Sequence, residues 1–403
     1  MTIHSLRAGA AIADLPWRTA RDTARGLPRP LGPEEVALAT AAGRILAAPV
    51  RALAPLPGCD TAAMDGYAVR GPGPWRVVGR RLAGSTASLV LAPGTAVEIA
   101  TGAPVPAGAA AVVPYEECRR DGEHVMSERR ARTHIRRAGE DARPGEELVP
   151  AGRRVTSAVL GAAAQAGHDT LTVYRRPAVR LVVTGDEIVH SGVPSPGLVR
   201  DAFGPAVSAI VAGSGGTTSA VAFAPDDRAT LHAAVTAPGA DVVVVTGSSS
   251  VGAADHLHRV LADLGAAWHV DGVLCRPGHP QLLASLPGGA WVVGLPGNPF
   301  AGLVAAVTLL QPLLEALTGT TAAPTVRLPV TGACKVPEHG VRIVPVRLET
   351  THAEIVTAAR PASLRAAATA DALAVIEPGW TGGAPADLLL LHESGPGPAV
   401  PTT

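Results

Sequence analysis

Residues 178–187 read AVRLVVTGDE and residues 240–252 read ADVVVVTGSSSVG, two apolar runs that each end in glycine and polar side chains. Short continuous Val-rich runs of this kind are typical of buried parallel strands. Residues 291–319 predict a further strand, a turn and a long helix. Other helices are predicted over residues 202–216, 226–239 and 255–266. This order predicts a βαβ region with a parallel sheet.

The flanking segments predict a different architecture. Residues 33–50 predict a helix, because Pro33 and two glutamates open the segment and Gly43 marks its exit. Prolines then punctuate short Val-rich runs, a pattern typical of a small β-rich domain. Residues 157–167 predict another helix, and short alternating segments after Pro324 predict a β-rich C-terminal domain.

Composition indicates a soluble multidomain protein. The 403 residues exceed one ordinary domain, and no apolar run approaches the roughly 20 residues of a membrane helix. The start of the chain lacks the pattern of a secretory signal, so we expect a cytoplasmic protein. Thirty-four basic residues balance 34 acidic ones, which argues against nucleic acid or a membrane as partner. The four scattered cysteines form no CxxC pair, which argues against a zinc ribbon or a disulfide framework.

Three loops should lie at the carboxyl ends of the predicted strands, where open parallel sheets bind their ligands. They are residues 184–187, 246–252 and 294–299, and all contain glycine or small hydroxyl residues that let a phosphate approach the backbone. A single such glycine more often only makes a turn, but three loops in one domain favour a binding site. No GxGxxG, GxxxxGK[ST] or GxSxG motif follows these strands, which argues against nicotinamide cofactors, P-loop ATP hydrolysis and a serine hydrolase.

Carboxylates are the second signal. Asp186 and Glu187, Asp226 and Asp227, and Asp255 fall near predicted strand ends or helix starts, where together they could hold Mg²⁺ against phosphate oxygens. Helix N-capping is the alternative, and we expect it for at least one of Asp226 and Asp227. His256 and His258 are two residues apart, a spacing that does not suit metal ligands on one helix face.

Several of these motifs carry a family resemblance. Residues 59–70, CDTAAMDGYAVR, resemble the signature near the start of the molybdopterin molybdenumtransferases. The order continues as in that family with TGAPVP at 101–106, GED at 139–141, TGDE at 184–187, SVG at 250–252 followed by Asp255, RPG at 276–278, and GLPGNP at 294–299. The resemblance covers nearly the whole chain.

The resemblance implies an α/β multidomain fold: a three-layer α/β/α molybdopterin-binding domain, a β-rich insert domain and a C-terminal β-barrel, assembled as a homodimer. The expected boundaries are 1–55 with 146–177 for an N-terminal linking domain, 56–145 for the insert, 178–325 for the α/β/α domain and 326–403 for the barrel. Gephyrin is a eukaryotic relative of this family.

The resemblance also implies the chemistry. Family members cleave adenylylated molybdopterin, release AMP and insert molybdate into the dithiolene, assisted by Mg²⁺. Matching motif positions give Asp65, Thr101, Arg136, Asp141 and Glu187 as catalytic candidates, and Glu187, Asp226 and Asp255 as metal ligands. The residues expected to bind the pterin nucleotide are Thr184, Gly185, Gly247, Ser248, Ser249, Ser250, Gly252, Arg276, Gly278, Pro296, Gly297 and Asn298.

The chain departs from the family pattern at four places: Ser248 and Ser249 replace glycines, Ala253 replaces a glutamate, His279 replaces a lysine, and Ala202-Phe203 replaces a threonine-asparagine pair. These changes leave two alternatives open. One is a diverged paralogue acting on another adenylylated or phosphorylated substrate. The other is a catalytically weak binding or scaffolding protein, as gephyrin shows is possible.

Overall fold

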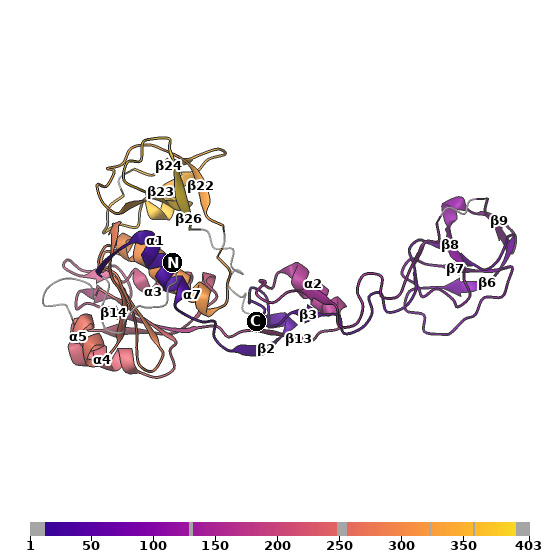
Figure 1. Ribbon diagram of the computed structural model, residues 1–403, viewed down its shortest axis with the longest axis horizontal. Helices are drawn as coiled ribbons and strands as arrows, with labels where there is room; N and C mark the ends of the chain where they lie inside the picture. Colours follow the sequence, from indigo (N-terminus) through magenta and orange to yellow (C-terminus); the bar gives the residue numbers. More distant parts are fainter. Residues whose placement is uncertain (1–12, 129–131, 248–255, 323, 358, 392–403) are drawn as a thin grey trace, which may run out of the picture.

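The computed structural model describes residues 13–128, 132–247, 256–322, 324–357 and 359–391. The molecule is long: one end holds an α/β/α body with a β-barrel beside it, and the other end holds a separate β-rich unit (Figure 1). A narrow region containing α2 (Ser157–Gln165) joins the two ends.

The α/β/α body is built on parallel strands. Strand order runs β17–β14–β18–β21, and β20 and β19 continue the sheet in antiparallel pairs. The N-terminal strand β1 (Ala13–Pro16) pairs in parallel with β19. The bounds are β14 Ala178–Thr184, β17 Thr217–Ala224, β18 Val242–Thr246, β19 Ala267–Arg276, β20 Leu282–Ser285 and β21 Trp291–Leu295. The two Val-rich runs are therefore neighbouring strands, as the sequence predicts.

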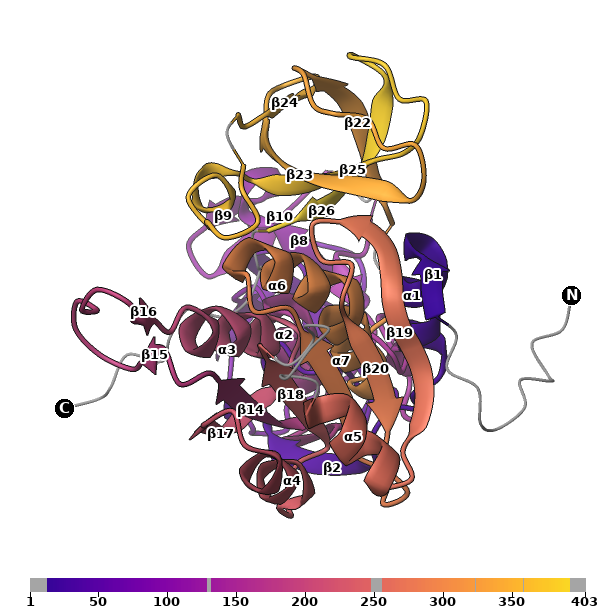
Figure 2. The ribbon, with the colours of Figure 1, turned by 90° about the vertical axis from the view of Figure 1, so that its left-hand side faces the viewer.

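Alternate residues of these strands face two different cores. Val179, Leu181 and Val244 pack with one layer of helices, whereas Val243 and Val245 pack with the other. The first layer contains α1 (Trp17–Gly26), α3 (Phe203–Gly213), α6 (Pro299–Ala305), the π-helical segment η3 (Ala306–Leu310) and α7 (Gln311–Leu317). The second contains α4 (Arg228–Thr236) and α5 (His256–Asp263). Because both faces are covered, the central strands β18 and β21 are mainly apolar, and the three-layer α/β/α prediction is confirmed (Figure 2).

The continuous helical run Pro299–Leu317 is long and apolar enough to cross a membrane by length and composition. The expectation that no apolar stretch approaches such a span was therefore wrong. However, 78% of the most apolar window is buried inside the protein. The run is apolar on most sides because strands and helices surround it.

The β-rich insert contains a six-stranded sheet in the order β8–β5–β7–β6–β10–β9. Its strands are β5 (Gly66–Val69), β6 (Trp75–Arg81), β7 (Thr95–Ile99), β8 (Ala111–Pro114), β9 (Arg119–Asp121) and β10 (His124–Met126). The short helical turn η2 (Tyr115–Glu117) follows β8. Trp75 is almost completely buried on one side of this sheet. At its neck, β4 (Thr61–Ala62) pairs with β11 (Ile135–Arg136).

The linking region differs from the sequence prediction. Residues 33–50 do not form a helix: β2 (Pro33–Ala37) pairs along its length with β13 (Thr170–Tyr174), and the 3₁₀ turn η1 (Leu38–Thr40) follows. Val36 pairs with Leu171, so a long-range strand pairing overrides the local helical signals. The other pair here is β3 (Val50–Arg51) with β12 (Glu147–Val149). Helix α2 is confirmed.

Helix α1 is an element that the sequence prediction missed. Its apolar residues Trp17, Ala20 and Ala24 are buried against the α/β/α core. Their spacing of three and four residues is a helical signal. The many charged residues between them weakened that signal.

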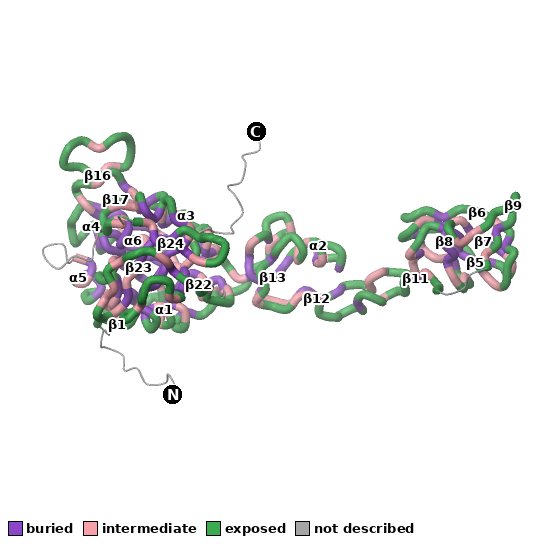
Figure 3. The backbone as a smooth tube through the Cα atoms, turned by 90° about the horizontal axis from the view of Figure 1, so that it is seen from above, coloured by how far each residue is buried: buried purple, intermediate pink, exposed green. Residues whose placement is uncertain are grey.

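The C-terminal unit closes on itself. Its five strands pair in the ring β22–β24–β23–β25–β26 and back to β22, which confirms the predicted β-barrel. The bounds are β22 Val326–Thr331, β23 Val341–Leu348, β24 Ala353–Ile355, β25 Ala372–Ile376 and β26 Pro385–Leu390, with the turn η4 at Ala367–Thr369. Burial is concentrated in the barrel, the α/β/α body and the insert, and is sparser in the narrow link (Figure 3).

Candidate functional site

The described parts of the three predicted loops meet at the carboxyl ends of β14, β18 and β21. Thr184 donates its hydroxyl to the Thr246 carbonyl, and the Gly247 amide donates to the Leu295 carbonyl at 3.1 Å. A Cβ on Gly247 would lie 2.9 Å from the Thr184 hydroxyl oxygen, and a Cβ on Gly297 would lie 3.4 Å from the Gly247 Cα. Glycine is therefore needed for the loops to approach one another so closely.

Beside these loops lies a group of carboxylates. Gly185, with φ of +136°, turns the chain so that Glu187 folds back over it, and a Cβ at Gly185 would meet the Glu187 carboxylate at 2.7 Å. The Asp226 amide donates to Asp186 Oδ1 at 3.4 Å. Residues 184–187 and the segment before α4 therefore form one carboxylate cluster at this edge of the sheet.

Within the described residues, His256 compensates the charge of the carboxylate cluster only in part. Burial raises the pKa of Asp226, and the negative charges of Asp186 and Glu187 raise it further. A divalent cation at this position would relieve that repulsion, so these residues fit the predicted Mg²⁺. Within the described residues no group of three or more ligands is already arranged around a metal position. The third predicted ligand, Asp255, lies outside the described residues.

Asp227 has a structural role instead. It caps α4 by accepting hydrogen bonds from the Thr230 amide and hydroxyl, both at 2.7 Å. These bonds lower its pKa. The N-capping expected for one of the two neighbouring aspartates thus belongs to Asp227.

The predicted loop at Arg276 lies against the same body. Gly278 has φ of +101°, and a Cβ there would lie 3.2 Å from the Ala301 carbonyl of α6. The Gly278 carbonyl accepts a hydrogen bond from the side-chain amide of buried Gln281 at 2.7 Å. Pro296, Gly297 and Asn298 form the loop that enters α6, so α6 connects this loop with the one at Gly278.

The other predicted site residues gather at the neck of the insert. Asp65 Oδ1 accepts from the Thr101 amide at 2.6 Å and from its hydroxyl at 3.0 Å, and these bonds lower the Asp65 pKa. Arg136 of β11 forms an ion pair with Asp141. All four side chains are exposed. The strand pair β4–β11 holds the two groups together.

These two halves are far apart within one chain. The linking region separates the neck of the insert from the α/β/α body (Figure 1). The structure therefore places the predicted residues that it describes in two separate half-sites. Ser248, Ser249, Ser250 and Gly252 lie outside the described residues.

Comparison with known proteins finds matches for the regions that carry both half-sites. Residues 15–167 match the family described as "MoeA N-terminal region (domain I and II)", and residues 180–316 match the "Probable molybdopterin binding domain". A molybdopterin molybdenumtransferase of Nostoc is 34% identical over 303 residues, covering 71% of this chain and 70% of that protein. The chain belongs to the molybdopterin molybdenumtransferase family.

Two further relatives agree with this placement. Molybdopterin molybdenumtransferase 2 of Mycobacterium tuberculosis is 36% identical over 311 residues, covering 71% of this chain and 76% of that protein. The crystal structure of a molybdopterin biosynthesis MoeA protein from Pyrococcus horikosii has a TM-score of 0.79 and 27% identity, covering 94% of this chain and 99% of that one. The family resemblance read from the sequence is therefore confirmed.

Two departures from the family pattern have structural roles. Phe203 is buried at the start of α3, and its ring occupies the space where a side chain at Gly302 of α6 would stand, 2.1 Å from that position. Asp201, also buried, accepts from the amides of Phe203 and Gly204. His279 makes a 2.7 Å hydrogen bond with Asp14 of β1.

One functional candidate was not singled out from the sequence. Asp60 accepts from the Ala138 amide at 2.9 Å and pairs with Arg137 at 2.6 Å, and the Ala138 bond is the main cause of its lowered pKa. It ties the Asp65 segment to the segment that carries Arg136 and Asp141. Its place inside the matched motif, five residues before Asp65, was the available signal.

Proposed function

We propose that this protein is a molybdopterin molybdenumtransferase that inserts molybdate into adenylylated molybdopterin and releases AMP. The observation that carries the proposal is the meeting of three glycine-containing strand-end loops beside a carboxylate cluster. The loops offer close backbone approach for the phosphates of a nucleotide, and Arg276, at the end of β19, is the cation that we propose for them. Such a reaction on small molecules fits a cytoplasmic enzyme with no nucleic-acid or membrane partner.

Mg²⁺ is the metal we propose for the carboxylate cluster, with Glu187, Asp226 and Asp255 as its ligands. When bound, it would screen the phosphoanhydride and stabilise negative charge that develops on the phosphate leaving group. Without a cation, burial and the negative charges of Asp186 and Glu187 together raise the pKa of Asp226. Water attacking the phosphoanhydride would need a carboxylate near it to accept its proton, and Glu187 is the candidate.

The half-site at the neck of the insert has a complementary role. Its Asp65 is fixed by two hydrogen bonds from Thr101, and its ion pair of Arg136 with Asp141 is exposed. A guanidinium held in this way binds oxyanions with two parallel hydrogen bonds, which suits molybdate or a phosphate. Asp65 and Asp141 would orient that guanidinium and the water around the oxyanion.

Both half-sites act on one substrate only if a second copy of the chain joins them. Within one chain they lie on opposite sides of the linking region (Figure 1). We therefore propose a homodimer in which the insert of each subunit reaches the α/β/α body of its partner. A two-fold dimer would create two equivalent composite sites.

A single reaction tests the function. Purified protein is incubated with adenylylated molybdopterin, molybdate and Mg²⁺, and AMP is measured by chromatography. We expect AMP release that depends on both molybdate and Mg²⁺, and restored molybdoenzyme activity in a bacterial strain that lacks its own molybdenumtransferase. Binding of the substrate with no AMP release would favour the scaffolding alternative. AMP release only from another adenylylated compound would favour the diverged paralogue. Buried Phe203, one of the departures from the family pattern, motivates this alternative.

A further inference from the structure

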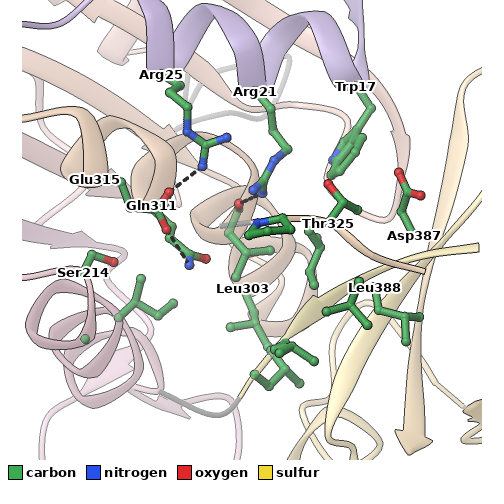
Figure 4. Close-up of a pocket in the computed structure, with 18 of the residues that line it drawn as sticks. Trp17, Arg21, Arg25, Ser214, Leu303, Gln311, Glu315, Thr325, Asp387 and Leu388 are labelled. Atoms are coloured by element: carbon green, nitrogen blue, oxygen red, sulfur yellow. Dashed lines mark hydrogen bonds and ion pairs between the residues drawn. The ribbon is translucent and has the colours of Figure 1, made fainter. Parts of the chain in front are cut away.

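A cavity of about 760 Å³ lies between α1, α3, the helical run that follows α6, and strand β26 of the barrel. Its volume is in the range that holds small-molecule ligands. Figure 4 shows Arg21 and Arg25 extending from α1 toward this cavity, with Leu303, Gln311 and Glu315 opposite them. The described residues of the three candidate phosphate loops do not contribute to its lining, so we treat it as separate from the proposed transferase site.

Two arginines that line this cavity have N–H groups without a hydrogen-bond partner among the described residues. Arg25 pairs with Glu315, but its Nε is buried and has no hydrogen-bond partner among the residues that the structure describes. Arg21 donates to the Val307 carbonyl and lies 5.3 Å from the centre of the Trp17 ring, and no carboxylate among the described residues forms an ion pair with it. A guanidinium has five N–H donors, so most of those on Arg21 remain available.

The charge on Arg21 is poorly compensated. Burial lowers the pKa of Arg21 to about 10, and the positive charge of Arg25 adds to the effect. The other basic residue of α1 at the cavity, Arg18, is already paired with Glu377 and Asp387. Glu315 and Asp22 offset only part of this effect, so an anion between Arg21 and Arg25 would relieve the repulsion that remains.

The helical run under Arg21 is itself irregular. Residues Ala306–Leu310 are π-helical, and Val307, which accepts from Arg21, lies within this segment. Trp17 donates to the Thr308 hydroxyl of the same segment at 3.1 Å. π-Helical turns are rare and occur frequently at functional sites. Here the turn fixes the position of the arginine that faces the cavity.

From these observations we infer that the cavity is a binding site for a phosphate-bearing small molecule, held by the guanidinium groups of Arg21 and Arg25. The non-phosphate part of the ligand would lie on Leu303, Val307 and Ile210, which form an apolar wall. Because α6 and η3 are continuous with the loop at Gly297, an occupied cavity adjoins the helix that leads from the transferase site.

Inorganic pyrophosphate is the probe for this site. Isothermal titration calorimetry on the full-length dimer at low salt should show binding that Arg21→Gln weakens by about tenfold or more, the size expected for one charge-assisted contact. Arg21→Lys should recover part of the affinity, because it restores the charge without the guanidinium fork. Arg29→Gln, which removes an exposed arginine outside the cavity, should bind as wild type.

A second variant separates this site from the transferase site. Arg276→Gln should weaken any pyrophosphate binding at the strand-end loops and leave the stoichiometry at the α1 cavity unchanged. Loss of all binding in Arg276→Gln, with unchanged affinity in Arg21→Gln, would overturn the proposal, as would no binding to wild type at millimolar pyrophosphate. If circular dichroism shows that Arg21→Gln is misfolded, Arg25→Gln provides the same comparison, and unchanged affinity there would also overturn it.

Discussion

The two half-sites shift the pKa of their carboxylates in opposite directions. At the neck of the insert, Asp65 receives two hydrogen bonds from Thr101, and its pKa falls. At the sheet edge, Asp226 lies beside Asp186 and Glu187, and its pKa rises. The first half is complete within the protein and is arranged before any ligand arrives. The second is electrostatically incomplete and would gain most from a cation or a partner group.

The same contrast is visible in how each half is held. At the sheet edge, Gly185 and Gly247 have positive φ angles that disfavour a side chain, and a Cβ at Gly247 would also lie 3.0 Å from the Thr184 carbonyl oxygen. The neck depends on β4 and β11, each only two residues long, and on the ion pairs of Arg136 and Arg137 with aspartates. Exposed ion pairs contribute little to stability, so we expect the neck to adjust when a partner subunit docks.

The largest expected effect is loss of chemistry from either half. Glu187→Gln and Asp65→Asn each remove a charge with little change in volume, and each should reduce AMP release by about 10²–10³-fold, the scale of one lost electrostatic contact in a transition state. The measurement is the initial rate of AMP formation at saturating Mg²⁺. Asp121→Asn, an exposed carboxylate in the insert outside the neck, is the matched control and should keep the wild-type rate. A wild-type rate for Asp65→Asn would remove the insert half from the site.

Mixing these two inactive variants tests whether the halves meet across subunits. In a dimer that carries Asp65→Asn on one chain and Glu187→Gln on the other, one composite site has both substitutions and the other has neither. Random exchange makes half of the dimers mixed, so activity should recover to about a quarter of wild type. Subunits are exchanged by mild denaturation and refolding, and each variant treated alone is the control. No recovery, with mixed dimers demonstrated by mass spectrometry, would place both halves of each site in one chain.

A smaller effect should follow from disturbing the packing under the sheet-edge loops. A Cβ at Gly302 would lie 2.1 Å from the Phe203 ring, so Gly302→Ala should destabilise the protein by about 1–3 kcal/mol, as overpacking of a core does. Adding Phe203→Ala should remove the clash, and the double variant should be more stable than the sum of the two single changes predicts. Denaturant unfolding followed by circular dichroism measures both. Strict additivity would show that the ring and the glycine do not restrict each other.

Much of the sheet-edge half could be predicted from the sequence, because its information is local. Each strand is a short apolar run, each loop follows its strand directly, and parallel strands bring their carboxyl ends together. The helix expected over residues 33–50 was wrong because β2 exists only through its pairing with β13, more than 130 residues away. The role of Phe203 was also not predictable, because it depends on the approach of α6, nearly 100 residues later.

The smallest expected effect is the pH dependence of stability, because the carboxylates of the two half-sites should change stability in opposite directions. Asp65 has a lowered pKa in the folded protein, so its ionised form stabilises the fold above the usual aspartate pKa of 3.8, and this contribution is lost as pH falls through the folded value. Asp226 has a raised pKa, so its contribution is present below 3.8 and is lost as pH rises through the folded value.

At neutral pH without metal, Asp65→Asn should therefore lower the unfolding temperature, whereas Asp226→Asn should raise it. The Asp226 difference should shrink as the pH falls through the raised pKa of its folded form, whereas the Asp65 difference should persist down to 3.8 and shrink only below it. Thermal unfolding in EDTA across this range is the measurement, with Asp121→Asn as control for the substitution itself. Adding Mg²⁺ should raise the unfolding temperature of wild type but not that of Asp226→Asn. With Mg²⁺, wild type should therefore be more stable than Asp226→Asn, the reverse of the order in EDTA. If both variants were destabilised equally in EDTA, the contrast between a complete and an incomplete half-site would be wrong.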